Sequence, residues 1–167
     1  TQHHIQARYS HKFNESLEWS TSLNYTRGDG YYENYKADTK FSKYGMQAPE
    51  ASIKKSDFII QQAMLNDYYA FNTALNYNSS NLKASAALSY GYYDGNHFGD
   101  VLWSKHMTLD NTYRWYENKG LKKDYSAYLR AEWNPTHKVT FFADLQYRGI
   151  SYKLEGPDKD FAVLNWE

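Results

Sequence analysis

The amino-acid sequence predicts an all-β fold: an antiparallel transmembrane β-barrel segment, with about six strands of a larger barrel. Three observations predict this fold class. Apolar and polar residues alternate with a period of two in six separate runs. The runs are joined alternately by short turns and by long segments, and aromatic residues gather near both ends of the apolar stripe. Residues 1–167 then form one partial β-barrel domain made of three hairpins.

The composition limits the classes of function. Lys plus Arg and Asp plus Glu number 19 each, and this formal net charge of zero argues against a nucleic-acid partner. The chain has no cysteine, so disulfides and thiolate metal sites are excluded. The mean hydropathy is −0.87, although 19% of the residues are aromatic and 18 are Tyr. Tyr has an apolar body and a polar tip, which suits a boundary between lipid and water.

The first hairpin is expected at the start of the chain. Residues 5–13 alternate, Asn14-Glu15-Ser16 supply a turn, and residues 17–26 alternate again, which together indicate two antiparallel strands. One face of this pair carries Ile5, Ala7, Tyr9, Phe13, Leu17, Trp19, Thr21, Leu23 and Tyr25.

The same unit recurs twice. Residues 69–77 and 82–90 flank Asn78-Ser79-Ser80-Asn81, and residues 125–133 and 139–147 flank Asn134-Pro135-Thr136-His137. Their apolar faces carry Tyr69, Phe71, Thr73, Leu75, Tyr77, Leu82, Ala84, Ala86, Leu88, Tyr90, Tyr125, Ala127, Leu129, Ala131, Trp133, Val139, Phe141, Ala143, Leu145 and Tyr147. Gly149 then disturbs the alternation and predicts a bulge or a strand end.

The connections are expected to be strongly unequal. Each strand is assigned roughly ten residues, the length that a tilted strand needs to cross a bilayer. Long extracellular loops are expected at about residues 28–66 and 94–124, because short turns at one end and long loops at the other are typical of outer-membrane barrels.

The aromatic residues of the apolar face fall into two groups. Phe13, Trp19, Tyr77, Trp133 and Phe141 lie near the short turns, and Tyr25, Tyr69, Tyr90, Tyr125 and Tyr147 lie near the long connections. Two such rows with Ala, Leu and Thr between them resemble the interfacial girdles of a lipid-facing band. The alternative is that the rings flank the strands of a soluble β-sandwich.

Six strands are too few to close a barrel around a filled interior. The simplest explanation is that the chain forms one arc of a larger barrel. Two other segments, residues 57–64 and 101–106, are candidates for additional strands.

Three stretches resemble TonB-dependent outer-membrane receptors of the Bacteroidetes type. They are Tyr25-Thr26-Arg27-Gly28-Asp29-Gly30-Tyr31-Tyr32-Glu33-Asn34-Tyr35-Lys36, Tyr113-Arg114-Trp115-Tyr116-Glu117-Asn118-Lys119-Gly120 with Lys122-Lys123-Asp124, and Phe142-Ala143-Asp144-Leu145-Gln146-Tyr147-Arg148-Gly149-Ile150-Ser151-Tyr152. The resemblance implies the middle of a 22-stranded barrel in the bacterial outer membrane. We expect the plug domain of such a receptor to lie outside this segment.

The resemblance also implies a function and partners. Such a receptor binds a scarce ligand, for example an iron-siderophore, haem or cobalamin, or else a sugar or a peptide, and imports it with energy from TonB. The implied partners are outer-membrane lipids, the receptor's own plug domain, TonB and a surface lipoprotein.

The expected loops supply the candidate ligand-binding residues, because aromatic faces can stack on a ligand and Arg can pair with an anionic chelate. The candidates are Arg27, Tyr31, Tyr32, Tyr35, Trp103, Arg114, Trp115 and Tyr116. The alternative is that the loops pack on each other with the same rings. No catalytic signature, resident cofactor or metal site is expected, since the six His residues lack the spacing of a metal centre.

Two other functions stay open at this point. One is a soluble β-sandwich that acts as a carbohydrate-binding module through its loop aromatics. The other is a small closed barrel that serves as an adhesin or an enzyme scaffold.

Overall fold

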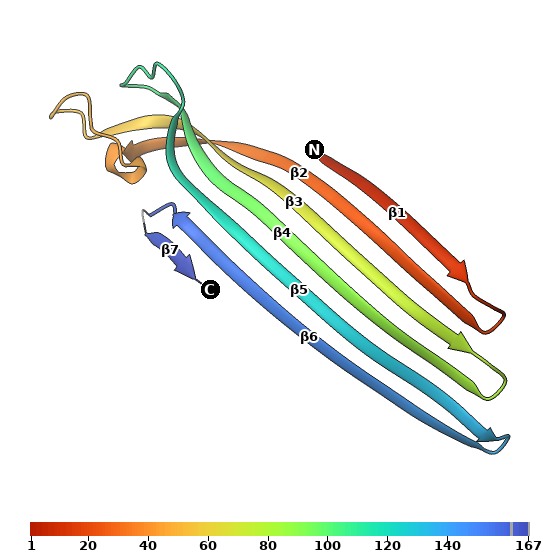
Figure 1. The fold of residues 1–167 in the computed structure, drawn as a ribbon. Helices are drawn as coiled ribbons and strands as arrows, with labels where there is room; N and C mark the ends of the chain where they lie inside the picture. Colours follow the sequence, from red (N-terminus) through yellow and green to blue (C-terminus); the bar gives the residue numbers. More distant parts are fainter. Residues whose placement is uncertain (161, 167) are drawn as a thin grey trace.

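The computed structural model describes residues 1–160 and 162–166 and consists of one antiparallel sheet (Figure 1). Every strand lies beside its neighbours in the sequence, in the order β1 to β7. The elements are β1 (Gln2–Lys12), β2 (Leu17–Lys40), the 3-10 helix η1 (Phe41–Tyr44), β3 (Lys55–Asn78), β4 (Leu82–Ser104), β5 (Tyr113–Thr136), β6 (Val139–Pro157) and β7 (Val163–Trp166). The all-β antiparallel fold is therefore confirmed. No helix in the described ranges is long and apolar enough to span a membrane.

The three expected hairpins are present, and the strand register unites their apolar sides. Trp19 pairs with Leu75, Leu88 pairs with Ala127, and Leu129 pairs with Leu145. Because side chains alternate along a strand, these pairings bring every apolar position of β2 to β6 named above onto one side of the sheet. We call this side the apolar face and the opposite side the polar face.

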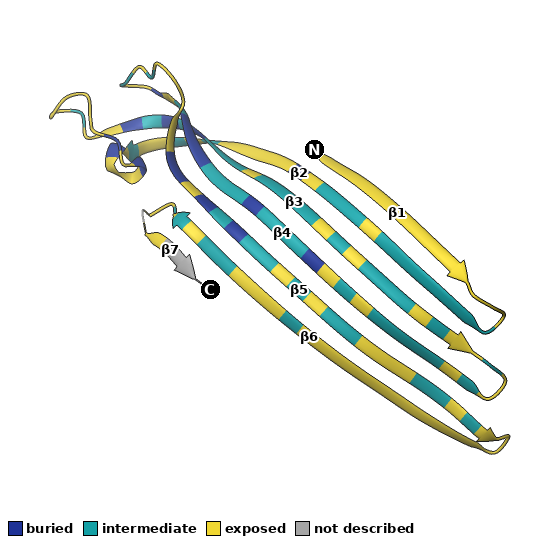
Figure 2. Ribbon diagram, in the orientation of Figure 1, coloured by how far each residue is buried: buried dark blue, intermediate teal, exposed yellow. Residues whose placement is uncertain are grey.

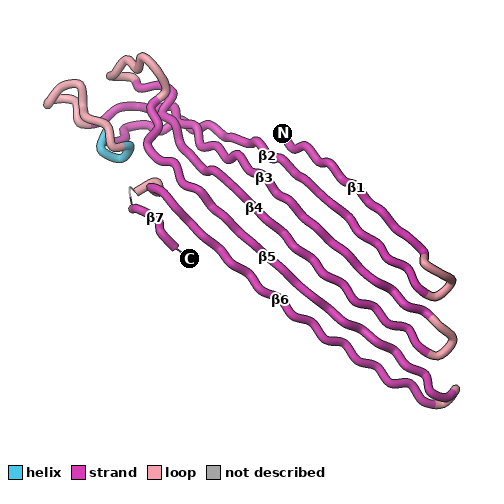
Figure 3. Tube along the Cα trace, viewed as in Figure 1, coloured by secondary structure: helices cyan, strands magenta, loops and turns pink. Residues whose placement is uncertain are grey.

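The prediction of long loops at residues 28–66 and 94–124 is wrong. Most of these residues belong to strands, since β2 pairs with β3 as far as Lys40 and Lys55, and β4 pairs with β5 as far as Val101 and Tyr113. The actual connections are residues 41–54 and 105–112 (Figure 3). We call the end of the sheet that carries them the distal end.

The expected strand length of roughly ten residues is also wrong. β2, β3 and β5 contain 24 residues each, which corresponds to about 80 Å at roughly 3.3 Å per residue. Residues 57–64 lie inside β3 and residues 101–104 inside β4, so they lengthen existing strands and add none.

The turn signal at Gly28-Asp29-Gly30 misled the prediction for a physical reason. Glycine often marks a turn because it tolerates a positive φ, but only Gly45 and Gly156 adopt one among the described glycines. Gly28 is extended, and the absent side chain leaves room for Asn66 on β3.

Gly149 neither ends β6 nor forms a bulge. It pairs with Tyr125 in regular register, and a Cβ atom at Gly149 would lie 2.3 Å from the ring of that tyrosine. The glycine therefore provides space for a cross-strand aromatic ring.

The sheet is open in the part of the chain that the structure describes. β7 pairs only with residues 154–157 of β6, so most of β6 has an unpaired edge, and β1 pairs with β2 alone. Figure 2 shows β1 and most of β6 as exposed.

A compact hydrophobic cluster lies at the distal end. η1 contributes Phe41 and Tyr44, whose rings contact Phe58 at centroid distances of 5.2 and 5.0 Å. Tyr44 also contacts Trp115 at 5.1 Å. The buried members of this distal cluster are Phe41, Tyr44, Met46, Phe58, Ile60, Val101, Trp115 and Tyr116. Their packing holds the 41–54 connection against β3, β4 and β5.

Candidate functional site

The structure distributes the eight predicted ligand-binding residues over two sides of the sheet. Arg27, Tyr31, Tyr35, Trp103 and Arg114 lie on the continuation of the apolar face, whereas Tyr32 and Tyr116 lie on the continuation of the polar face. Trp115 is buried in the distal cluster at a bulge of β5, with 7% of its surface exposed. The eight residues therefore do not form one site.

The two predicted cationic candidates are already paired. Arg27 lies 3.6 Å from Asp67. Arg114 donates to Asp100 at 3.0 Å and to Glu117 at 2.8 Å, and its guanidinium lies 4.0 Å from the centre of the Phe98 ring. The hydrogen bond with Asp100 raises the pKa of Arg114 further above its ordinary value. These contacts neutralise both cations on the side away from the polar face.

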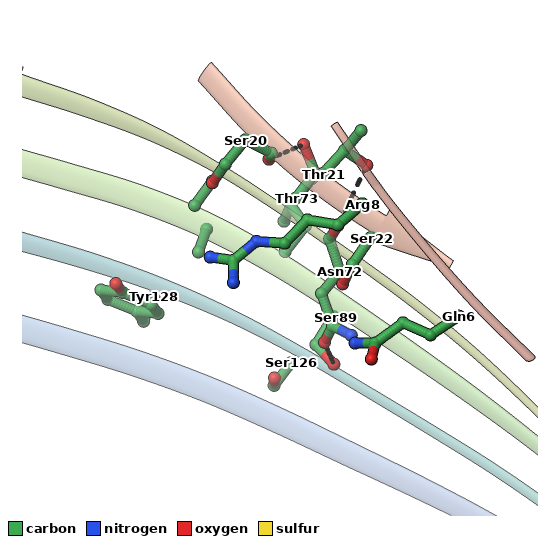
Figure 4. A pocket seen from close by; sticks show the side chains of 13 residues that line it. Gln6, Arg8, Ser20, Thr21, Ser22, Asn72, Thr73, Ser89, Ser126 and Tyr128 are labelled. Atoms are coloured by element: carbon green, nitrogen blue, oxygen red, sulfur yellow. Dashed lines mark hydrogen bonds between the residues drawn. The ribbon is translucent and has the colours of Figure 1, made fainter. Parts of the chain in front are cut away.

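A hollow of about 400 Å³ lies across the middle of the polar face (Figure 4). Its side chains carry hydroxyl and amide groups, as where Ser89 donates to Asn72 at 2.8 Å. This central hollow is lined by Gln6, Arg8, Ser20, Thr21, Ser22, Asn72, Thr73, Ala74, Ala87, Leu88, Ser89, Ser126 and Tyr128. No element in the described part of the chain covers this hollow, because all its strands belong to one sheet.

A second hollow, of about 560 Å³, lies near the distal cluster on the same face. Strands β2 to β5 and the segment after β6 all contribute to it. This distal hollow is lined by Gly30, Tyr31, Tyr32, Gln62, Ala63, Met64, His97, Tyr116, Asn118, Asp158 and Lys159. Of the eight predicted residues, Tyr31, Tyr32 and Tyr116 line it.

Two hydrogen-bond chains fix the polar side chains of the distal hollow. In the first, the Tyr32 hydroxyl donates to Gln62, and the Gln62 amide donates to the Tyr116 hydroxyl at 3.1 Å. In the second, Asn118 lies 3.3 Å from His97 and donates to Asp158 at 3.4 Å. Burial raises the pKa of Tyr116, so its hydroxyl stays protonated at neutral pH.

Sequence reasoning missed Gln62, His97 and Asn118. The signal that could have found them is the strand period, since Tyr32 pairs with Gln62 across β2 and β3 and both face the same side. The loop assignment hid this relation because loops have no fixed alternation.

A serine–histidine contact lies at the distal end. Ser56 Oγ lies 3.2 Å from His106 Nδ1 and 3.0 Å from Ser104 Oγ. Ser56 is only 2% exposed, and its hydroxyl also contacts the Asp57 carbonyl oxygen. We assign this group a structural role in joining the ends of β3 and β4. Among the described residues, no three His, Asp or Glu side chains are placed to hold a metal ion.

Comparison with protein-family models finds no match, and comparison with curated proteins finds no similar sequence. The two faces of the sheet and the distal hollow are therefore the features that bear on function.

Proposed function

We propose that this chain forms one arc of an outer-membrane β-barrel that belongs to a TonB-dependent receptor. The apolar face supports this proposal because it is exposed and continuous over β2 to β6. Leu88, Leu129 and Leu145 near its centre are 57%, 58% and 68% exposed. Between the two aromatic rows this face carries no Asp, Glu, Lys or Arg. A surface of this size and composition suits lipid better than water.

The observation that carries the proposal is the shared stagger of the two aromatic rows. Cross-strand pairs connect Tyr25 on β2 to Ser151 on β6, whereas the aromatic residue on β6 is Tyr147, four residues earlier. The same route connects Trp19 to Leu145, and Phe141 again lies four residues earlier. Both rows therefore cross the strands at one angle.

The angle agrees with the geometry of membrane barrels. Four residues correspond to about 13 Å along a strand. The four inter-strand spacings between β2 and β6 correspond to about 19 Å across the sheet. The strands would then be tilted by about 35° from the normal of the band, within the range of about 35–45° for membrane barrels. On β3 and β5 the aromatic residues lie eight positions apart, at Tyr69 and Tyr77 and at Tyr125 and Trp133. With this tilt the band is about 22 Å high, near the expected 25 Å.

Charged residues begin directly beyond the distal aromatic row. On the same side of the sheet, Arg27 pairs with Asp67 at 3.6 Å and Lys119 pairs with Asp94 at 2.9 Å. The Tyr25 hydroxyl donates to Asp67 at 2.6 Å, so this tyrosine joins the apolar and charged regions. Such a sharp change is typical of a lipid–water boundary.

The unpaired edges and the polar face support the rest of the proposal. A membrane-embedded sheet must pair all its edges, so β1 and β6 would be joined by further barrel strands. The polar face would then line the lumen and contact the plug domain. The distal hollow, which lies on this face beyond the distal aromatic row, would lie outside the membrane. In this arrangement the receptor binds a small-molecule ligand there and imports it with energy from TonB. A surface lipoprotein is a further partner of this function.

A carbohydrate-binding β-sandwich has less support. It would need a second sheet over the apolar face, and all strands in the described ranges belong to a single sheet.

The membrane proposal is tested with adjacent residues on opposite faces. These 167 residues contain no cysteine, so Leu88→Cys and Ser89→Cys each give one labelling site within them, and any cysteine elsewhere in the reading frame is replaced by serine. The receptor is expressed from the complete reading frame that contains this chain, spin-labelled and reconstituted in lipid vesicles. We expect position 88 to be accessible to oxygen and shielded from a water-soluble nickel chelate, and position 89 to show the opposite. Equal access of the nickel chelate to both positions would contradict a lipid-facing sheet.

A further inference from the structure

The distal hollow is electrically balanced. Among its lining residues, only Asp158 and Lys159 carry a formal charge at neutral pH with His neutral. The amino group of Lys159 lies 5.8 Å from the centre of the Tyr116 ring, and Asp158 accepts the hydrogen bond from Asn118. Recognition of an anionic chelate or a phosphate favours several Arg or Lys side chains that converge on one point. The described lining residues provide one such side chain.

The remaining polar groups of the hollow are neutral. The amide nitrogen of Gln62 has two N–H groups and gives one to Tyr116, and the amide nitrogen of Asn118 gives one of its two to Asp158. Each amide thus combines donor and acceptor capacity in one plane. A hydroxyl group of a ligand is also both a donor and an acceptor, so a polyhydroxylated ligand can match these amides.

The polar groups are held in place before any ligand arrives. Asn118 is 7% exposed and Tyr116 is 4% exposed, and both belong to the hydrogen-bond chains described above. Ordered groups lose little conformational entropy on binding, which favours affinity. Met64, which faces the same side as Gln62, adds an apolar surface against which the C–H face of a sugar ring could lie. The volume of about 560 Å³ is within the usual range for a small-molecule site.

We propose that the distal hollow binds a neutral, polyhydroxylated ligand of the saccharide class, rather than an anionic iron chelate. This inference rests on the proposed receptor function, because it takes the polar face to line the lumen of the barrel.

The test uses the purified receptor from the complete reading frame, in a detergent without a sugar headgroup such as lauryldimethylamine oxide. Maltotriose, cellotriose and xylotriose serve as neutral probes, and ferric citrate serves as the anionic chelate. Isothermal titration calorimetry measures the Kd for each. We expect at least one trisaccharide to bind, and Gln62→Leu to weaken that binding about tenfold, since one or two hydrogen bonds are lost.

Gln61→Leu is the matched control. Gln61 is the same residue type at the adjacent position of β3, faces the opposite side and donates to Glu33 at 3.1 Å. We expect this variant to change the Kd less than twofold. Binding of ferric citrate without any trisaccharide, no binding of any probe, or equal effects of the two variants would each overturn the saccharide assignment.

Failure of this inference can be separated from failure of the receptor proposal. The spin labels at positions 88 and 89 report the membrane arrangement without any ligand. The same labels, placed in the Gln62→Leu background, show whether that variant still folds in the membrane.

Discussion

At the scale of single residues, glycines leave space for aromatic rings that pack across the strand. A Cβ atom at Gly99 would lie 2.3 Å from the Tyr116 ring and 2.4 Å from the Trp115 ring. Gly149 relates to Tyr125 in the same way, at 2.3 Å. Glycine weakens a strand by its own flexibility, and rings packed across it offset that cost. These glycines are therefore packing positions and not turn positions.

The Gly99 position gives a direct test of this role. Gly99→Ala should lower the free energy of unfolding by about 1–3 kcal/mol, because the added methyl group must displace two buried rings. Gly30→Ala is the control, since nothing lies within 4 Å of the position of its Cβ atom. The control should change stability by less than about 0.5 kcal/mol or raise it slightly. Urea unfolding of both variants measures the difference, and equal losses would refute the seating role of Gly99.

At the scale of elements, the distal end of β2 is held by a carboxylate on β3. Asp38 has a φ of 46°, and its N–H donates to Asp57 at 3.0 Å beside the bulge between Lys36 and Thr39. The Tyr35 hydroxyl also donates to Asp57 at 2.7 Å, and Lys105 lies 3.5 Å away. One side chain thus connects the ends of β2 and β3 with the 105–112 connection.

Low pH should weaken the contacts that Asp57 makes with Tyr35, Asp38 and Lys105. The hydrogen bond from the Asp38 N–H, the hydrogen bond from Tyr35 and the charge of Lys105 lower the pKa of Asp57 below its ordinary value of 3.8. A carboxylate with a lowered pKa stabilises the folded state above its unfolded pKa, and this contribution is lost as the pH falls through the folded value. Hydrogen exchange at the Asp38 amide should therefore become faster, relative to the intrinsic rate, only below about pH 4.

Asp57→Asn separates the charge from the shape of this side chain. The variant should show faster exchange at the Asp38 amide at neutral pH and should lose the additional acid response. Asp29→Asn is the control, because Asp29 on β2 lies on the same side of the sheet as Asp57. This variant should keep the wild-type exchange rate and acid response of the Asp38 amide. An unchanged acid response in Asp57→Asn would assign the effect to another group.

The sequence predicted the positions of the short turns and the face of each apolar residue, but not the ends of the strands. Alternation near Trp19 or Leu129 is strong because one side of the strand is apolar and the other polar. Beyond Tyr25 both sides become polar or aromatic, as at Arg27 and Tyr32, so the period carries no contrast. For the same reason the sequence predicts the distal hollow only in part: it indicates Tyr32 and Tyr116 but not their shared partner Gln62, nor the pair His97 and Asn118.

At the scale of the whole molecule, the proposed bilayer position predicts how a charge is tolerated. Leu129→Lys would place an ammonium group near the middle of the lipid band, which should lower the free energy of unfolding by about 2–4 kcal/mol. Ser126→Lys lies on the polar face of the same strand and should cost less than about 1 kcal/mol. Urea titration of the receptor in lipid vesicles measures both. Similar costs for the two variants would contradict the assignment of the two faces.

The order of the strands also bears on how the sheet assembles. Each strand pairs with the next in the sequence, and the connections between them are a few residues long at one end and 14 or 8 residues long at the other. Closing such loops costs little chain entropy. Each hairpin can therefore form from its turn outward, without contacts to segments that are distant in the sequence. The pairing of β1 and β6 with further strands would not be favoured by a short turn in the same way. We therefore expect the arc to form quickly and the seams at its two edges to set the rate of folding.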